Sequence, residues 1–328
     1  MTTLVYTAPA GGYTFQQILS ANWGDEDVRQ STSSTIQVRV PVSGAVNGNL
    51  DIFVTGSFTY SHGDLSGGVV NGFSMTLNGP AFIQYSSFSV AVQTFLDTNF
   101  NDANAMVNLL MSGDDSLAGS SLADQLLAGS GADTVSGGGG ADVIVGGDGA
   151  SYLRGDDGDD QITGGANFDD INGNVGDDTA SGGLGDDWVV GGKDNDSLTG
   201  EAGDDIVYGN LGDDICVGGD GADLVRGGQQ NDSLSGGAGN DWLSGDRGDD
   251  TVTGGAGADI FHTFGEAGVD RVIDFSRAEG DRVMLDPGTT YTVAQQGADV
   301  VVALGGGGQM VLVNVQLSSL TGDWIFGA

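Results

Sequence analysis

Aspartate recurs at every ninth position over nearly half of the chain. The spacing holds for 17 consecutive positions without an insertion, and 16 of these positions are Asp. Carboxylates and main-chain carbonyls are hard oxygen donors, and six or more of them around one ion favour Ca²⁺ over softer metals. After Asp115, with only Ser151 breaking the series, the aspartates that we expect to bind calcium are Asp124, Asp133, Asp142, Asp160, Asp169, Asp178, Asp187, Asp196, Asp205, Asp214, Asp223, Asp232, Asp241, Asp250 and Asp259.

These aspartates occupy the sixth position of a nine-residue unit. A clean copy runs from Gly182 to Val190 and follows the pattern G-G-x-G-x-D-x-U-x, in which U is a bulky apolar residue. Gly, Asp and Asn in the first six positions favour tight turns and left-handed backbone. The last three positions favour a brief strand. Because side chains alternate across a strand, position eight points inward while positions seven and nine point outward.

Two units together make one coil with a turn on each edge. Coils that stack by parallel pairing at about 4.8 Å give a rod on the order of 40 Å long. The sequence therefore predicts an all-β chain built on a parallel β-roll, or β-solenoid, of 18-residue coils. One aliphatic layer per strand is a thin core for so many glycines, and a column of carboxylates on each edge repels itself. We therefore expect folding to be coupled to Ca²⁺ binding.

The stretch from residue 110 to residue 262 resembles the RTX family, whose nonapeptide repeats form a Ca²⁺-loaded parallel β-roll. The resemblance implies that one ion is shared by two successive turns on the same edge. The first turn supplies the carbonyls of positions two and four with its Asp, and the next supplies those of positions one and three with its own Asp. One such set is Gly183, Gly185 and Asp187 with Gly200, Ala202 and Asp205.

The same resemblance marks the position-four glycines as calcium-site residues. They are Gly131, Gly140, Gly149, Gly158, Gly176, Gly185, Gly203, Gly212, Gly221, Gly239, Gly248 and Gly257. The frame offers eight adjacent turn pairs on one edge and seven on the other, and two of these 15 include Ser151, which leaves up to about 13 ions. Sites beside Ser151, Leu122 and Gln230 are expected to be the weakest, since Leu and Gln tolerate left-handed backbone poorly.

Net charge narrows the possible partners. The charge is −37 at pH 7, with only nine basic residues. Phosphate would be repelled, so we expect no nucleic acid partner. No apolar run is long enough to span a bilayer, so membrane insertion is not expected. The single cysteine, Cys216, falls on an inward position and is expected to be a small buried hydrophobic residue.

The two flanks follow different patterns. Residues 1–109 are expected to form a small antiparallel β domain, a sandwich or barrel with a possible helix near 91–110, because apolar and polar residues alternate there. Its expected strands are Thr35–Val42, Leu50–Tyr60, Gly72–Leu77 and Ala81–Val92. In residues 263–328, Gly268–Phe275 and Gly280–Leu285 resemble the C-terminal cap of the RTX family, and strands are expected at Thr290–Ala294, Asp299–Ala303 and Met310–Val315.

Export is expected to follow from the C-terminal end. Residues Leu320–Ala328 are acidic and apolar and resemble the uncleaved signal of type I secretion, although an ordinary last strand is the alternative. Residues Met1–Phe15 have neither the basic nor the apolar region of a secretory signal peptide. We therefore expect the type I secretion machinery as a partner and a secreted, extracellular or cell-surface location in bacteria.

No catalytic constellation is recognisable in the sequence. The two histidines, His62 and His262, are far apart, so a zinc motif of the H-E-x-x-H type is impossible. No G-x-S-x-G elbow and no P-loop occur. The chain is therefore not expected to be an enzyme, and an unrecognised hydrolase in residues 1–109 is the remaining alternative.

The outward faces of the roll are expected to differ. One face carries an apolar stripe, and the other carries mainly Ser and Thr. The stripe is interpreted as an interaction face because contiguous apolar patches mark interfaces, unless a flanking domain covers it. Its residues are Tyr152, Trp188, Ile206, Tyr208, Leu224, Trp242 and Ile260.

These features favour a structural protein that self-assembles as a filament or lattice, such as a surface layer or biofilm matrix. The alternative is an adhesin or carbohydrate-binding module. It would bind a cell-surface glycan through residues 1–109 or through the apolar face.

Overall fold

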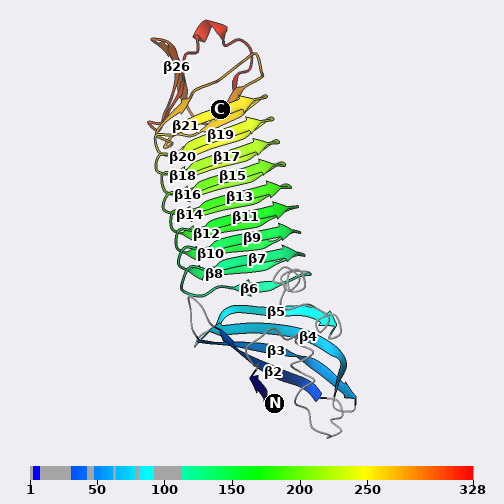
Figure 1. The fold of residues 1–328 in the computed structure, drawn as a ribbon. Helices are drawn as coiled ribbons and strands as arrows, with labels where there is room; N and C mark the ends of the chain where they lie inside the picture. The colour runs from blue at the N-terminus through cyan, green and yellow to red at the C-terminus, as the bar shows by residue number, and fades with distance from the viewer. Residues whose placement is uncertain are drawn as a thin grey trace.

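The computed structural model describes the backbone of residues 3–7, 31–42, 48–61, 64–77 and 81–91, and backbone and side chains of residues 113–327. Within these residues the strands form two sheets that run along a rod of stacked coils (Figure 1). The even-numbered strands from β6 to β22 lie in one sheet, and the odd-numbered strands from β7 to β21 lie in the other. The parallel β-roll that the nine-residue period predicts is therefore confirmed.

Successive strands of one sheet are one coil apart in sequence. Strand β14 (Trp188–Lys193) pairs in parallel with β16 (Ile206–Leu211), and Trp188 lies opposite Ile206. The other even strands are β6 (Ser116–Ala118), β8 (Thr134–Gly139), β10 (Tyr152–Asp157), β12 (Asp170–Val175), β18 (Leu224–Gln229), β20 (Trp242–Arg247) and β22 (Ile260–Thr263). The odd strands are β7 (Gln125–Ser130), β9 (Val143–Asp148), β11 (Gln161–Ala166), β13 (Thr179–Leu184), β15 (Ser197–Ala202), β17 (Ile215–Asp220), β19 (Ser233–Ala238) and β21 (Thr251–Ala256).

Most roll strands are six residues long, which is twice the expected length. Each continues from position seven of one unit to position three of the next, as β14 does. Pairing is interrupted at position one and resumes at position two, where Gly192 lies opposite Asn174. Gly192 has a φ of 130° and Asn174 a φ of 79°, so left-handed backbone lets the strand bend without losing its partner. The glycine half of the unit therefore belongs to the strand as well as to the turn.

The core is a single column of inward side chains. All position-eight residues from Leu117 to Phe261 are buried, including Cys216. Full burial of one aliphatic side chain stabilises the fold by roughly 1.5–3 kcal/mol. At the C-terminal end the column closes with aromatic contacts, since the ring of Phe275 lies 5.8 Å from that of Phe261 and 6.4 Å from that of Trp324.

The N-terminal strands continue the sheet of even-numbered strands. They are β1 (Thr3–Thr7), β2 (Ser31–Val42), β3 (Gly48–Ser61), β4 (Asp64–Leu77) and β5 (Ala81–Ala91). Strands β2 to β5 pair in antiparallel order, and β5 pairs with β6 of the roll. The predicted helix near 91–110 and the expected boundary at 109 lie outside the described residues, and the second layer of a sandwich stays a prediction.

The C-terminal region adds strands to both sheets. Strands β23 (Val269–Val272), β27 (Gln309–Leu312), β26 (Asp299–Leu304) and β25 (Tyr291–Gln296) extend one sheet beyond β21. Strands β24 (Arg282–Leu285) and β28 (Ile325–Phe326) extend the other beyond β22, and a 3₁₀ turn, η1 (Leu317–Ser319), lies between β27 and β28. The suggested secretion signal thus includes a short last strand, with Arg282 placed over the ring of Phe326.

Candidate metal centre

The position-six aspartates form a hydrogen-bonded column along each edge of the roll. The amide of Asp187 donates to Oδ1 of Asp205 over 2.7 Å, and the amide of Asp169 donates to Oδ1 of Asp187 over 2.8 Å. The other carboxylate oxygen of Asp187 is buried and has no hydrogen-bond partner. The same unpartnered Oδ2 occurs at Asp133, Asp142, Asp160, Asp169, Asp178, Asp196, Asp205, Asp214, Asp223, Asp232, Asp241, Asp250 and Asp259.

Glycines hold each carboxylate close to the backbone of its own turn. A Cβ placed at Gly182, in position one, would overlap Oδ2 of Asp187. A Cβ placed at Gly203, in position four, would overlap the carbonyl oxygen of Gly185 in the turn below. Position one therefore leaves room for the carboxylate, and position four leaves room for a stacked carbonyl. Both oxygens are thereby directed to the same narrow edge.

Burial and mutual repulsion make these carboxylates hard to ionise without a counter-charge. Desolvation, with smaller contributions from neighbouring aspartates, raises the pKa of Asp169 and Asp178 to about 7. The same causes raise the pKa of Asp196 and Asp232 to about 8. Hydrogen bonds from the backbone lower these pKa values only partly. Each edge therefore presents a row of carboxylates that requires protons or cations.

Calcium fits this row. Within residues 113–327, no three side chains of His, Cys, Asp or Glu converge on one point, so an ion there depends on main-chain carbonyls as well as on Asp. Carbonyls and carboxylates are the hard oxygen ligands of Ca²⁺. When bound, the ion supplies positive charge to oxygens that the protein leaves without donors. The residues that would hold it are the position-six aspartates and the carbonyls of the adjacent glycine turns.

The departures from the repeat differ in their effect. Asn167, Asp194 and Gln230 replace glycine at position four yet keep left-handed backbone, with φ values of 66°, 72° and 78°. Gln230 thus adopts the left-handed backbone that it tolerates poorly, and the weak site expected beside it stays a prediction. Leu122 has no positive φ. In its turn, Oδ2 of Asp124 accepts hydrogen bonds from the amide and hydroxyl of Ser120, over 2.6 and 2.9 Å. Oδ2 of Asp124 thus has hydrogen-bond donors within the protein, whereas the Oδ2 atoms named above have none.

Position five forms a second ladder, which the sequence interpretation missed. Oδ1 of Asp186 accepts the amide of Asp204 in the next coil over 2.9 Å, and Asn195 accepts the amide of Asp213 in the same way. These side chains tie successive turns together on the solvent side of the metal column. The frequent Asp and Asn at position five of the repeats is the signal that could have revealed them.

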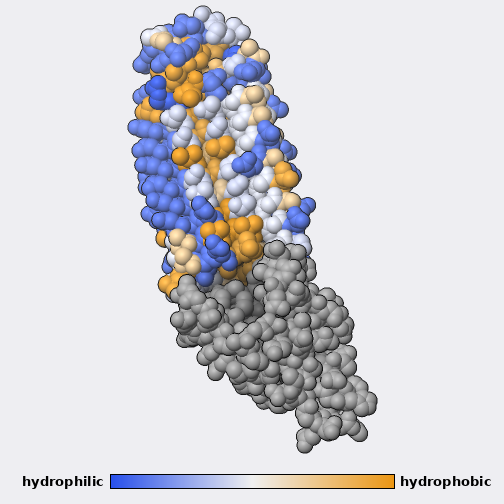
Figure 2. Space-filling model, viewed as in Figure 1, coloured by the Kyte–Doolittle hydropathy of each residue, from blue (hydrophilic) through white to orange (hydrophobic). Residues whose placement is uncertain are grey.

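The predicted apolar stripe lies on one sheet, in continuous register. Trp188, Ile206, Leu224, Trp242 and Ile260 are opposite one another on successive even strands. Trp188 and Ile206 are 46% and 40% exposed, whereas the Trp242 ring is half-buried and stacks on the imidazole of His262 at 5.0 Å. Figure 2 shows hydrophobic groups among near-neutral ones on the face in view, beside a hydrophilic band that follows one edge of the roll. Tyr152 is 52% exposed, and the Arg154–Asp170 ion pair separates it from the rest.

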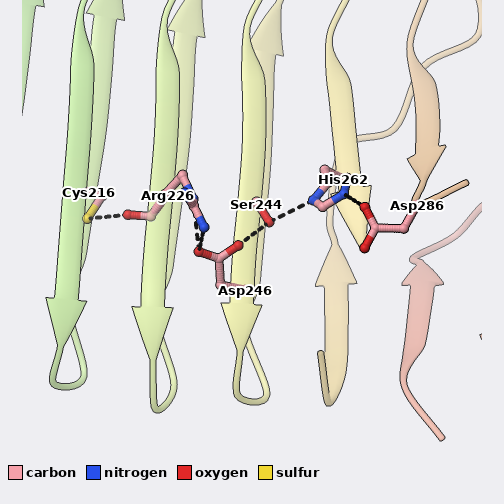
Figure 3. A network of polar contacts seen from close by, with 6 residues as sticks. All are labelled: Cys216, Arg226, Ser244, Asp246, His262 and Asp286. Carbon is pink, nitrogen blue, oxygen red and sulfur yellow. Dashed lines mark hydrogen bonds and ion pairs between the residues drawn. The ribbon is translucent and has the colours of Figure 1, made fainter. Parts of the chain in front are cut away.

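The same face carries a chain of polar contacts near the end of the roll (Figure 3). Asp286 contacts Nε2 of His262 at 3.2 Å, and Nδ1 of His262 lies 3.1 Å from the hydroxyl of Ser244. Ser244 donates to Asp246 over 2.7 Å, and Asp246 pairs with Arg226 at 2.6 Å. The buried hydroxyl of Ser244 thus lies between the Asp246 carboxylate and the imidazole of His262.

A groove of about 370 Å³ lies over this polar chain. Aromatic faces and charged groups alternate along it. The guanidinium of Arg226 lies 5.0 Å from the centre of the Tyr208 ring, and the rings of His262 and Phe264 stack at 6.3 Å. Its other polar lining residues are Gln229, Asp246, Arg247 and Asp286.

Comparison with known proteins places the repeats in a family. The model of the RTX calcium-binding nonapeptide repeat matches ten overlapping segments that together span residues 111–263. A search of curated proteins finds no match. Among solved structures, the extracellular lipase LipA of Serratia marcescens is 18% identical over 54% of this chain, with a TM-score of 0.24. The matched part is 39% of the length of the lipase.

A second similar structure is a subunit, AlgE6R3, of a mannuronan C5-epimerase from Azotobacter vinelandii. It is 27% identical over 42% of this chain and 79% of its own length, with a TM-score of 0.23. The family match covers the residues that form the carboxylate columns, and RTX repeats bind calcium and are typical of secreted proteins. Residues 111–263 are therefore RTX calcium-binding nonapeptide repeats, and this part of the chain is an RTX β-roll.

Proposed function

We propose that this is a secreted, Ca²⁺-dependent structural protein that assembles with copies of itself at or beyond the bacterial cell surface. The observation that carries the proposal is the apolar stripe, which follows five successive even strands beside the carboxylate columns. Exposed apolar residues in register can bury one another when two rolls meet face to face. The part of the chain that the structure describes holds no helix long and apolar enough to cross a bilayer.

Calcium would couple export to assembly. Before calcium binds, the carboxylates of each edge repel one another, and the glycine-rich chain stays unfolded and suited to a narrow secretion channel. Outside the cell, up to about 13 ions would fill the columns and set the strands in register. The apolar stripe exists only once the coils are stacked, because its residues are separated by 18 positions in sequence. Assembly should therefore require calcium.

Electron microscopy of the purified full-length protein tests the proposal, with millimolar Ca²⁺ or chelator. Filaments or sheets are expected only with calcium. The double change Trp188→Ser and Ile206→Ser should abolish them while the monomer still folds, since both side chains lie outside the buried core column and are 46% and 40% exposed. Ile215→Ser is the matched control, because Ile215 is 53% exposed on the opposite sheet. Unchanged assembly by the double variant would contradict the proposal.

The groove supports a second candidate function, binding of a cell-surface glycan. Sugar rings stack on aromatic faces, and paired Arg and Asp groups can hydrogen-bond to their hydroxyls, as in small-molecule sites with a few convergent polar groups. Tyr208, Phe264, Arg226 and Asp246 supply both kinds of contact. A glycan screen of the calcium-loaded protein, followed by titration of any hit, tests it.

For that titration, Tyr208→Ala should weaken binding at least tenfold. Tyr291→Ala, which changes an exposed tyrosine in the C-terminal region away from the groove, should leave it unchanged. Equal affinities for the two variants would assign the glycan to another part of the chain, such as residues 1–109.

A further inference from the structure

Beyond the last matched repeat, the chain regains the nine-residue frame with a shift of two residues. Thr263 and Phe264 fall outside the frame, and the segment Gly265–Ile273 then reads G-E-A-G-V-D-R-V-I. Gly occupies positions one and four of this segment, Asp270 position six and Val272 position eight. Val272 is buried in the core column as the repeat predicts. The family match ends at residue 263.

Two main-chain hydrogen bonds of this segment match those of a regular turn. The amide of Gly248 donates to the carbonyl of Ala267 over 2.7 Å, as Gly185 does to Ala202 over 2.9 Å. The amide of Arg271 donates to the carbonyl of Asp250 over 2.8 Å, as Ile206 does to Asp187.

Two further features also match. The amide of Val269 donates to Oδ1 of Asp249 over 2.9 Å, which extends the position-five ladder. Gly268 has a φ of 105°, and a Cβ there would overlap the carbonyl oxygen of Gly248. Asp270 therefore occupies position six of an additional turn above Asp250.

Asp270 leaves one carboxylate oxygen without a donor inside the protein. Its side chain is only 1% exposed, Oδ2 accepts the hydroxyl of Thr263 at 3.2 Å, and Oδ1 has no partner. Oδ2 of Asp250, one turn below, is also buried and unpartnered. Two unpaired buried carboxylate oxygens on neighbouring turns are costly unless a proton or a cation lies between them.

The other edge ends differently. Asp281 is the position-six residue above Asp259, since its Oδ1 accepts the Asp259 amide over 3.1 Å and Arg282 donates to the Asp259 carbonyl over 2.8 Å. However, Oδ2 of Asp281 accepts the amide of Ser276 over 2.7 Å. Both oxygens of Asp281 thus have backbone donors, and this carboxylate closes its column without leaving an oxygen for an ion.

We propose that the turn Gly265–Ile273 builds an additional Ca²⁺ site between Asp250 and Asp270, one rung beyond the matched repeats, whereas the opposite column ends at Asp281. The protein groups available to the ion are the free oxygens of Asp250 and Asp270 and the carbonyls of Asp246, Gly248 and Ala267. The site rests on the proposed calcium-dependent folding of the roll. It would fix the C-terminal strands β23 to β27 to the end of the roll.

Counting bound calcium tests the site. The full-length protein, saturated with Ca²⁺, is compared by equilibrium dialysis and native mass spectrometry with Asp270→Asn and Asp281→Asn. Asp270→Asn should bind one ion fewer than the unaltered protein. Asp281→Asn, which alters an equally buried position-six carboxylate, should keep the full number. Equal counts for all three proteins, or a loss in Asp281→Asn alone, would overturn the proposal.

A crystal of the unaltered protein grown with Tb³⁺ in place of Ca²⁺ keeps the proposal testable if Asp270→Asn does not fold. Anomalous density between Asp250 and Asp270 is expected, with none between Asp270 and the turns beyond it. Filled interior rungs with an empty Asp250–Asp270 gap would refute this site alone. Density at no rung would instead refute the calcium columns of the proposed function.

Discussion

Changing Ser151 to Asp should supply the one carboxylate that is missing from the two columns. Ser151 is 1% exposed, its hydroxyl has no partner, and its amide donates to Oδ1 of Asp169 over 2.8 Å, as the aspartates in other rungs do. At Gly146, in position one of the same unit, a Cβ would meet the Gly164 carbonyl and the Leu153 side chain instead of a carboxylate. The space that Oδ2 fills in other turns is therefore open to Ser151→Asp.

The expected change in the free energy of unfolding follows from ligand linkage, and its sign reverses without calcium. The new carboxylate would serve the gaps on both sides of residue 151. At a calcium concentration 100 times the dissociation constant, one added site stabilises the folded state by about 2.7 kcal/mol, so two sites give at most about 5 kcal/mol. In chelator, the same change adds a buried charge between Asp133 and Asp169 and should cost on the order of 3 kcal/mol.

Urea unfolding followed by circular dichroism measures both effects, in 10-fold steps of free Ca²⁺ down to the lowest concentration at which the unaltered protein still folds. Ser197→Asp is the matched control, because it adds the same charge at an exposed position on β15. Ser151→Asp should be more stable than the unaltered protein in saturating calcium and less stable at the lowest calcium concentration. If Ser151→Asp behaves like Ser197→Asp in both conditions, position six is not where the cation is held.

Two other changes test the column independently. In chelator, lowering the pH from 8 to 4.5 should restore β structure by circular dichroism, because the pKa values of Asp196 and Asp232 near 8 in the metal-free roll exceed the unfolded value of about 3.9. Such carboxyls favour folding when protonated, and this contribution is lost as the pH rises through the folded pKa. A chelated protein that gains no β structure on acidification would contradict this reasoning. Gly182→Ala should lower the thermal midpoint in calcium and reduce the calcium count, since the new methyl group overlaps Oδ2 of Asp187; an unchanged count would show that Oδ2 does not lie in the site.

The period of the sequence was sufficient to predict the coil, the core column and the two carboxylate edges. Each depends on strict alternation within a unit, and Val189 and Asp187 lie where positions eight and six require. The strand length was underestimated, because turn-forming residues such as Gly192 were expected to end a strand. In the structure its left-handed backbone lets pairing with Asn174 continue.

Contacts between coils could not be derived from the period alone. Sequence spacing does not reveal that the amide of one Asp donates to the carboxylate of the Asp 18 residues later, as Asp187 does to Asp205. It also does not reveal that Asp124 is held by Ser120 instead of being open to an ion. The turn around Asp270 was missed because the two inserted residues, Thr263 and Phe264, shift the frame. The hydrogen bonds that join Gly248 and Asp249 to this turn show that the frame resumes.

Calcium-coupled folding of the roll is the central claim, and a calcium titration of the full-length protein tests it most directly. Far-ultraviolet circular dichroism and small-angle scattering would be recorded on the same samples, from excess chelator to 10 mM Ca²⁺ at pH 7.5. A cooperative gain of β structure together with compaction of the chain is expected as calcium rises, and its reversal on adding chelator. Full β structure and a compact rod in excess chelator at this pH would contradict the account.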